Sequence, residues 1–151
     1  MNVRPFLAAD QPIFFRLAQE FYDSGSALRD YDEKLTKMTF DRVLAHHENL
    51  EGYFITRNDS HEVVGYALIT SYWCHEEGGT VLILDELYIA ENFRHQGYAS
   101  CFLEWLIEEY KEKAVALTLE VLTSNLTAQS LYQKEGFTPD GFMTMTKKII
   151  F

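Results

Sequence analysis

The sequence has little of what metal-binding and disulfide-bonded proteins depend on. Its 151 residues include only two cysteines, Cys74 and Cys101, which lie far apart and match no metal-binding spacing. The five histidines form neither an H-E-x-x-H motif nor a Cys/His ligand pattern. We therefore expect no metal site, and two free thiols in a reducing compartment.

Long apolar runs are also missing. The run that begins at Val81 is interrupted by Asp85 and Glu86, so no segment reaches the length of a membrane span. The first residues, Met1 to Pro5, lack the apolar centre of a signal peptide. These absences predict a cytoplasmic protein that has no membrane partner.

Positive charge is scarce: 13 Lys and Arg residues against 23 Asp and Glu residues give a formal net charge of −10. Such a chain repels the nucleic-acid backbone, so we expect no nucleic-acid partner. A hydrophobic content of 47% and an aromatic content of 15% predict a well-filled core. The length, without repeats or linkers, predicts one domain over residues 1–151.

Hydrophobic periodicity and turn residues predict alternating strands and helices in one mixed α/β layer sandwich. Helices are expected at Asp10–Tyr22, Leu35–His47, Gly97–Lys113 and Asn125–Gly136. Strands are expected at Asn2–Phe6, Gly52–Arg57, Glu62–Cys74, Val81–Ile89 and Ala116–Leu122, with a closing strand or hairpin arm at Gly141–Phe151.

The segment Arg94-His95-Gln96-Gly97-Tyr98-Ala99 joins an expected strand to an expected helix. The first amides of a helix have no partner within it, and the helix dipole makes this end partly positive, so the junction favours phosphate. Gly97 removes a side chain where a ligand would approach, and Arg94 can form two hydrogen bonds to phosphate oxygens. The alternative is an ordinary glycine turn.

A second segment runs from Asn125 to Phe137. At helical spacing, Asn125, Ala128 and Tyr132 lie along one stripe, and Gly136 ends the helix. The same pattern fits an amphipathic helix in which Tyr132 is a core aromatic residue with a hydrated hydroxyl.

Together the two segments resemble the GNAT superfamily of N-acetyltransferases. Its first motif, [Q/R]-x-x-G-x-[G/A], is matched by Arg94, Gly97 and Ala99. Its second motif, N-x-x-A-x-x-L-Y-x-x-x-G-F, is matched from Asn125 to Phe137. The chain departs from common family usage at Glu91, where proline is frequent, and at His95, where glycine is frequent.

The resemblance implies a mixed, mostly antiparallel central sheet that is flanked by helices on both faces. It also implies transfer of an acetyl group from acetyl-CoA, as co-substrate, to a primary amine. The residues that it assigns to the cofactor lie in three segments: Leu87, Tyr88 and Ile89; Arg94, His95, Gln96, Gly97, Tyr98, Ala99 and Ser100; and Asn125 with Tyr132.

Tyr132 is the candidate general acid for the departing sulfur, and its alternative role is packing that only orients the thioester. Asp85 and Glu86 are the candidate bases. Because side chains alternate along a strand, at most one of them faces the acceptor. We favour Glu86, since an acidic residue often precedes the Leu-Tyr pair in the family. Asn125 is expected to hold the cofactor arm, to cap its helix, or to do both.

The acceptor pocket is expected between the first two helices and the loop that joins them. The acceptor would be a small-molecule amine or a protein amino group, and a homodimer is among the assemblies that the resemblance allows. Two other functions stay open: a CoA-binding module without catalysis, and a transferase that uses another acyl-CoA.

Overall fold

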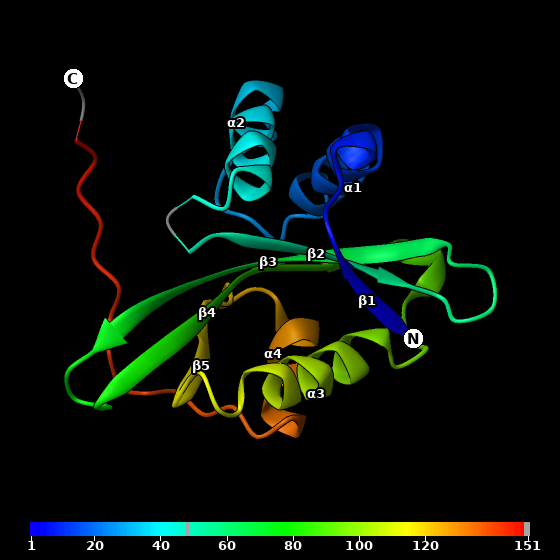
Figure 1. Cartoon of the computed structure of the whole chain (residues 1–151). Coiled ribbons are helices and arrows are strands. Elements are labelled where there is room, and N and C mark those ends of the chain that lie inside the picture. Colours follow the sequence, from blue (N-terminus) through cyan, green and yellow to red (C-terminus); the bar gives the residue numbers. More distant parts are fainter. Residues whose placement is uncertain (48, 150–151) are drawn as a thin grey trace.

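The computed structural model describes residues 1–47 and 49–149. One five-stranded sheet is at its centre, with the spatial order β1-β2-β3-β4-β5 (Figure 1). The strands are β1 (Asn2–Pro5), β2 (Glu51–Thr56), β3 (Val63–Cys74), β4 (Gly79–Ile89) and β5 (Ala116–Leu119). Neighbouring strands pair antiparallel except β4 and β5, which are parallel.

Helices cover both faces of the sheet, as the resemblance implied (Figure 1). Two lie on one face, α1 (Gln11–Asp23) and α2 (Glu33–Leu44); two lie on the other, α3 (Tyr98–Tyr110) and α4 (Leu126–Lys134). Short 3₁₀ turns, η1 (Ala8–Asp10) and η2 (Glu91–Phe93), precede α1 and α3. No helix among the described residues has both the length and the apolar character needed to cross a bilayer.

Local signals explain where the first two helices lie. In α1, Phe14, Leu17 and Phe21 recur at helical spacing and are all buried, so the helix presents one apolar stripe to the sheet. The Asp32 carboxylate accepts hydrogen bonds from the Lys34 and Leu35 amides, which are 2.9 and 3.1 Å away, and thereby caps the start of α2.

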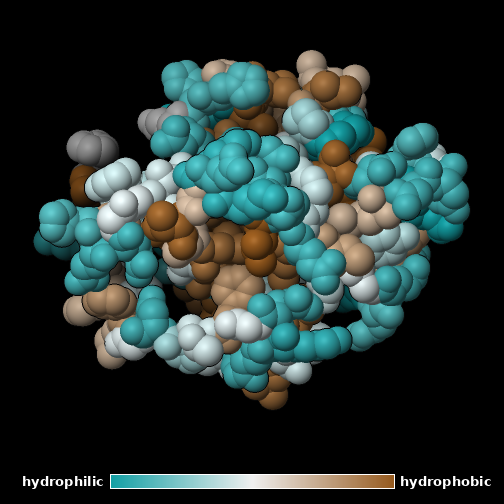
Figure 2. Space-filling model, turned by 60° about the horizontal axis from the view of Figure 1, so that its bottom comes forward, coloured by the Kyte–Doolittle hydropathy of each residue, from teal (hydrophilic) through white to brown (hydrophobic). Residues whose placement is uncertain are grey.

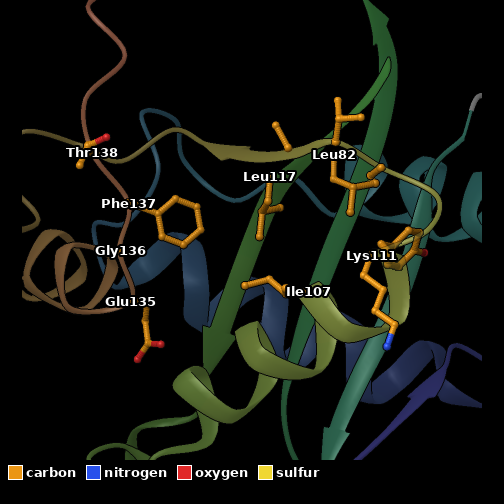
Figure 3. Close-up of a pocket in the computed structure, with 12 residues that line it drawn as sticks. Leu82, Ile107, Lys111, Leu117, Glu135, Gly136, Phe137 and Thr138 are labelled. Carbon is orange, nitrogen blue, oxygen red and sulfur yellow. The ribbon is translucent and has the colours of Figure 1, made fainter. Parts of the chain in front are cut away.

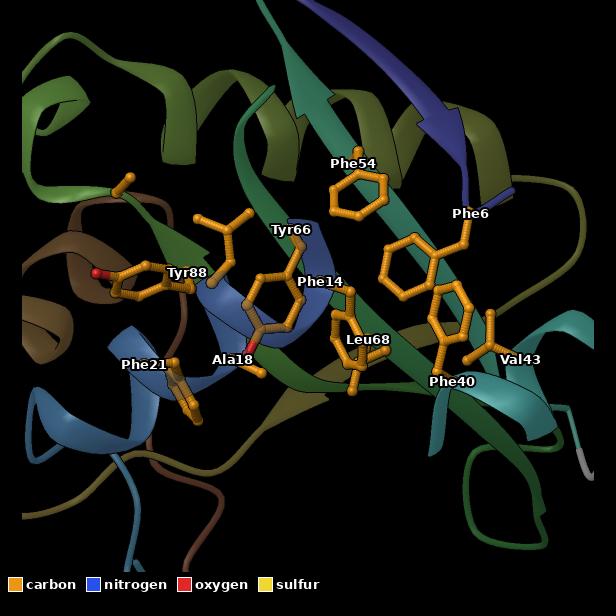
Figure 4. Packing of buried hydrophobic residues seen from close by; sticks show 12 residues of the cluster. Phe6, Phe14, Ala18, Phe21, Phe40, Val43, Phe54, Tyr66, Leu68 and Tyr88 are labelled. Carbon is orange, nitrogen blue, oxygen red and sulfur yellow. The ribbon is translucent and has the colours of Figure 1, made fainter. Parts of the chain in front are cut away.

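The two faces bury different kinds of side chain. Aromatic rings dominate under α1 and α2, where the rings of Phe6 and Phe54 are 4.4 Å apart and Phe14 meets Tyr66 edge-on at 5.3 Å (Figure 4). Aliphatic residues dominate under α3, including Leu84, Leu103 and Leu106. Both clusters include residues of β3 and β4, so these two strands lie at the centre of the protein.

The expected closing strand at Gly141–Phe151 is wrong for residues 141–149, which form no strand. Phe142, Met143, Met145 and Ile149 are 79–88% exposed, and β5 pairs only with β4 among the described strands. Strand-like composition alone gives no ladder, because a strand needs a neighbour to bond its backbone. Residues 150 and 151 of that expectation lie outside the described part.

Candidate active site

A bulge in β4 decides where the two candidate bases lie. Leu84 pairs with Ile69 and Glu86 pairs with Leu68, so Asp85 is an extra residue opposite no partner. The bulge shifts the alternation of side chains along the strand. Leu84 therefore packs on the α3 face, while Tyr88 packs on the α1 face, and Glu86 shares the face of Tyr88.

Glu86 is held by two tyrosines from different elements. The hydroxyl of Tyr22 on α1 donates to Oε1 at 2.9 Å, and the hydroxyl of Tyr66 on β3 donates to Oε2 at 2.7 Å. Burial raises the pKa of the Glu86 carboxyl, and the two hydroxyl donors oppose that rise. The site therefore contains a half-buried carboxylate whose two oxygens are both oriented.

Asp85 occupies a different environment on the exposed side of the bulge. Its pKa is raised, first because neighbouring protein desolvates the carboxyl and then because the Glu120 carboxylate lies close. Glu120 follows β5, so Asp85 faces the end of that strand, whereas Glu86 faces α1.

The two parallel strands separate at this point. Pairing of β4 with β5 ends at Leu84 and Leu119, although β4 continues to Ile89. Beyond Leu84, the edge of β4 that faced β5 has no strand partner among the described residues. The backbone at Leu87, Tyr88 and Ile89 can therefore accept an extended, amide-containing ligand on that edge.

The loop before α3 exposes the start of the helix. Gly97 is the N-cap residue, with φ of 84°, and a Cβ built there would meet no atom within 4 Å. The first hydrogen bond of the helix is donated by the Cys101 amide to the Gly97 carbonyl at 3.0 Å. The amides of Tyr98, Ala99 and Ser100 thus begin the helix without a backbone acceptor in the described region, which suits an anionic ligand.

Other loop residues stabilise this conformation. His95 adopts a left-handed φ of 60°, so the position where the family often has glycine keeps a glycine-like backbone. Arg94 donates from Nε to the Ile89 carbonyl at 3.0 Å, and its guanidinium lies 5.4 Å from the ring centre of Tyr88. Gln96 donates to the Asn92 carbonyl at 3.1 Å. Arg94 thus anchors the loop to the end of β4 through Nε and through its contact with Tyr88.

The helix α4 brings Asn125 and Tyr132 to the same face of the sheet as α3. The Asn125 Oδ1 accepts from the Ala128 amide at 3.1 Å, which confirms the helix-capping role. Tyr132 packs edge-on against Phe137, with ring centres 5.7 Å apart. Its hydroxyl has no hydrogen bond within the described chain, and burial raises its pKa to about 12. The phenol is therefore protonated at neutral pH and free to donate.

A small cavity of about 80 Å³ opens beside Glu86 and under the α1–α2 connection. Its apolar lining includes Phe14, Leu35 and Leu68, and its polar lining consists of Tyr22, Arg29, Asp30, Asp32, Thr36, Thr39 and Glu86. The sequence predicts the acceptor pocket in this region, where the structure has a cavity; that the cavity binds the acceptor stays a prediction. Among the tyrosines, Tyr22 lines the cavity, whereas Tyr72 lies at the far end of β3 and is exposed.

A larger groove of about 430 Å³ lies elsewhere, between α3, β5 and the end of α4 (Figure 3). Leu82, Ile107, Leu117 and Phe137 line it, and hydrophobic residues gather in a recess on this face of the molecule (Figure 2). The groove contacts β4 and β5 where their pairing begins, not where they separate. It contains neither candidate base and not Tyr132, so we do not assign the site to it.

The structure thus places Tyr22 and Glu86 side by side and adds Tyr66, a residue that the sequence patterns do not single out. Tyr66 was not among the candidates, because a tyrosine in an apolar strand pattern is typical of a core residue. Only the tertiary pairing of Leu68 with Glu86 places Tyr66, two residues earlier on the same face, beside the carboxylate.

A comparison with protein families identifies the chain. The sequence model of the Acetyltransferase (GNAT) family matches residues 12–137, which include both motifs and both candidate bases. The chain belongs to this family. As a GNAT acetyltransferase it is an acyltransferase with a mixed α/β sheet. No curated protein matches the chain.

Solved structures share the same fold. A probable acetyltransferase superposes with a TM-score of 0.82 at 20% identity, over 100% of this chain and 99% of the other. A possible acetyltransferase from Clostridium difficile 630 gives 0.85 at 15% identity, over 99% and 98%. Ribosomal-protein-alanine N-acetyltransferase from Brucella melitensis biovar Abortus 2308 gives 0.75 at 17% identity, over 98% and 100%. At these identities the likeness concerns the fold alone.

Proposed function

We propose that this GNAT protein is an acetyl-CoA-dependent N-acetyltransferase that acts on a primary amine. The observation that carries the proposal is the separation of β4 from β5 directly before Asp85 and Glu86. It leaves an open strand edge beside a half-buried carboxylate, with the helix start of α3 further along the same path. A cofactor arm and an acceptor can then approach from opposite faces of the sheet.

The residues present fit coenzyme A. An extended pantetheine arm carries amides that can pair with the β4 edge at Leu87, Tyr88 and Ile89. A diphosphate suits the amides of Tyr98, Ala99 and Ser100, and the open space at Gly97 lets its oxygens come close. Arg94 supplies positive charge in a chain whose net charge is −10, while His95 and Gln96 shape the loop.

Acetyl-CoA supplies the acetyl group as an activated thioester. An amine with a pKa of about 10.4 is mostly protonated at neutral pH, so a base must accept its proton before it can attack. Glu86 is the base in this proposal, because it lines the cavity under α1 and α2. Burial raises its pKa toward the working pH, which improves its match to that role.

Tyr132 is the proposed general acid. Its hydroxyl lies on the α3 and α4 face and has no hydrogen-bond partner among residues 1–47 and 49–149, so it can donate to the sulfur that leaves. With a pKa of about 12 the phenol stays protonated until the sulfur becomes strongly basic, which occurs as the thiolate forms in a desolvated site. Asn125 supports this role by capping the helix that carries Tyr132.

The test is release of free thiol from acetyl-CoA in the presence of polyamines, amino acids, aminoglycosides and peptide N-termini. We expect release with at least one amine, and a fall of about 10²-fold in kcat for Tyr132→Phe. Unchanged turnover in that variant would remove the acid role. Binding of acetyl-CoA without thiol release for any amine would favour a CoA-binding module, and release only from another acyl-CoA would change the donor.

A further inference from the structure

Both oxygens of Glu86 are engaged from elements that are far apart in sequence. Tyr22 lies 64 residues before Glu86 and Tyr66 lies 20 residues before it, yet each hydroxyl is within 2.9 Å of a different carboxylate oxygen. Neither tyrosine belongs to the two sequence motifs. The arrangement joins α1, β3 and β4 at the point where the bulge directs Glu86 into the cavity.

We propose that Tyr22 and Tyr66 are positioning residues for Glu86, which they hold with one oxygen each so that its remaining lone pairs face the acceptor amine. The inference rests on the proposed function. An ionised carboxylate has about four acceptor positions, and the two phenols use two of them. The others are available to an ammonium group in the cavity.

The two tyrosines have different surroundings. Tyr66 is completely buried, and its ring meets Phe14 and Phe21 edge-on at 5.3 and 6.4 Å. Tyr22 is half-buried, lines the cavity and packs against Tyr31 at 6.3 Å in the connection to α2. Tyr66 can therefore act only through Glu86, whereas Tyr22 can also contact the acceptor.

The electrostatic balance around Glu86 makes these donors necessary. Burial and the nearby Asp85 both favour the neutral acid, and the Tyr22 and Tyr66 hydroxyls favour the carboxylate. Asp30, Asp32 and Arg29 line the same cavity, so they set the field that an acceptor meets on entry. Loss of either hydroxyl shifts the balance toward the protonated form, which cannot accept a proton.

The test compares Tyr22→Phe and Tyr66→Phe with Tyr110→Phe. Tyr110 is a matched control, because its hydroxyl also donates to a glutamate, Glu51, at 2.7 Å, but on the opposite face of the sheet. We expect the acid limb of the kcat/KM profile to move to higher pH by about one unit in the first two variants and to stay in place in the control. KM for the amine should rise in Tyr22→Phe and not in Tyr66→Phe.

An acid limb that does not move in Tyr22→Phe and Tyr66→Phe would overturn the inference, even if kcat falls, because a merely structural role lowers kcat without moving the limb. Thermal melting identifies a variant that fails to fold, and Tyr22→Phe, at a half-buried position, then decides alone. The ¹³C carboxyl signal of Glu86 is titrated in parallel. If the wild-type protein releases no thiol, the proposed function fails, and an unshifted carboxyl titration would refute the positioning role separately.

Discussion

The two sides of the candidate site are built in opposite ways. On the acceptor side, under α1 and α2, the reactive carboxylate of Glu86 has both oxygens hydrogen-bonded by protein. On the cofactor side, at β4, α3 and α4, the groups that would act are left without protein partners in the described chain: the first amides of α3, the β4 edge and the Tyr132 hydroxyl. One side fixes a charge, and the other keeps donors free for a ligand.

The two sides also depend on different kinds of structure. The cofactor side uses local backbone features, a glycine turn and two helix starts, which short sequence motifs encode. The acceptor side uses contacts between residues 20 and 64 positions apart, and these exist only after the sheet has formed. Substitutions on the acceptor side should therefore change kcat, and substitutions on the cofactor side should change the affinity for coenzyme A.

The largest effect is expected from Glu86→Gln. The amide keeps the shape of the side chain but cannot accept the proton of the amine, so kcat should fall by about 10²-fold or more. CoA affinity, measured by calorimetry, should change little, because Glu86 faces away from the cofactor side.

Glu51→Gln is the matched control for this variant. Glu51 also accepts hydrogen bonds from two tyrosines, Tyr53 and Tyr110, but it lies outside the site. It should keep wild-type kcat while losing some thermal stability. Equal turnover in Glu86→Gln and wild type would show that solvent or another group serves as the base.

Gly97→Val is expected to weaken CoA binding on the cofactor side. A β-branched residue is strained at a φ of 84°, at a cost of about 1–3 kcal/mol, and its methyl groups would occupy the open space over the helix start. We expect CoA affinity to fall at least about tenfold, since each 1.4 kcal/mol of binding free energy is a factor of ten. Calorimetry with coenzyme A measures this affinity.

Gly78→Val is the control that separates the effect of backbone strain from an effect on CoA binding. Gly78 also has a positive φ, of 67°, with no atom within 4 Å of a built Cβ, but it lies in the β3–β4 turn. It should lower stability without changing CoA affinity. If both valine variants bind coenzyme A normally, the α3 loop is not the diphosphate site.

The elements that the sequence predicted well are those with local causes. The start of α3 at Tyr98 and the capping by Asn125 follow from residues within one helical turn. Alternation along β4 predicts that at most one of Asp85 and Glu86 faces the acceptor side, and only Glu86 turns toward α1. The sequence could not predict that the alternation of side chains shifts at Asp85. A bulge depends on the partner strand and leaves no signature in the sequence of β4.

Two other features could not be predicted from the sequence for the same reason. The role of Tyr66 requires knowledge of the β3–β4 register, which pairs Leu68 with Glu86. The strand expected at Gly141–Phe151 was wrong over residues 141–149 because apolar composition cannot specify a neighbour. Contacts between distant residues decide both cases.

A smaller effect is expected from Asn125→Ala on the cofactor side. Loss of the bond from the Ala128 amide should destabilise α4 by about 1 kcal/mol, measured as free energy of unfolding. The matched control is Ser130→Ala, an exposed position in the same helix, with an expected change within about 0.5 kcal/mol. If kcat falls in Asn125→Ala far beyond the loss of stability, Asn125 also contacts the cofactor.

The smallest effect is expected from Asp85→Asn, which tests whether the bulge selects one base. Asp85 faces Glu120 on the exposed side of β4, so kcat should stay within a factor of about three. The pKa of Asp85 is raised on folding, so the folded state disfavours its ionised form, and stability falls as pH rises through the unfolded and then the folded pKa. The asparagine variant should therefore melt slightly above wild type at pH 7 and at the same temperature in acid, below both pKa values. If kcat falls as much in Asp85→Asn as in Glu86→Gln, Asp85 is the base. The carboxyl that faces the end of β5 would then accept the proton of the amine, although the bulge directs Glu86 and not Asp85 into the cavity.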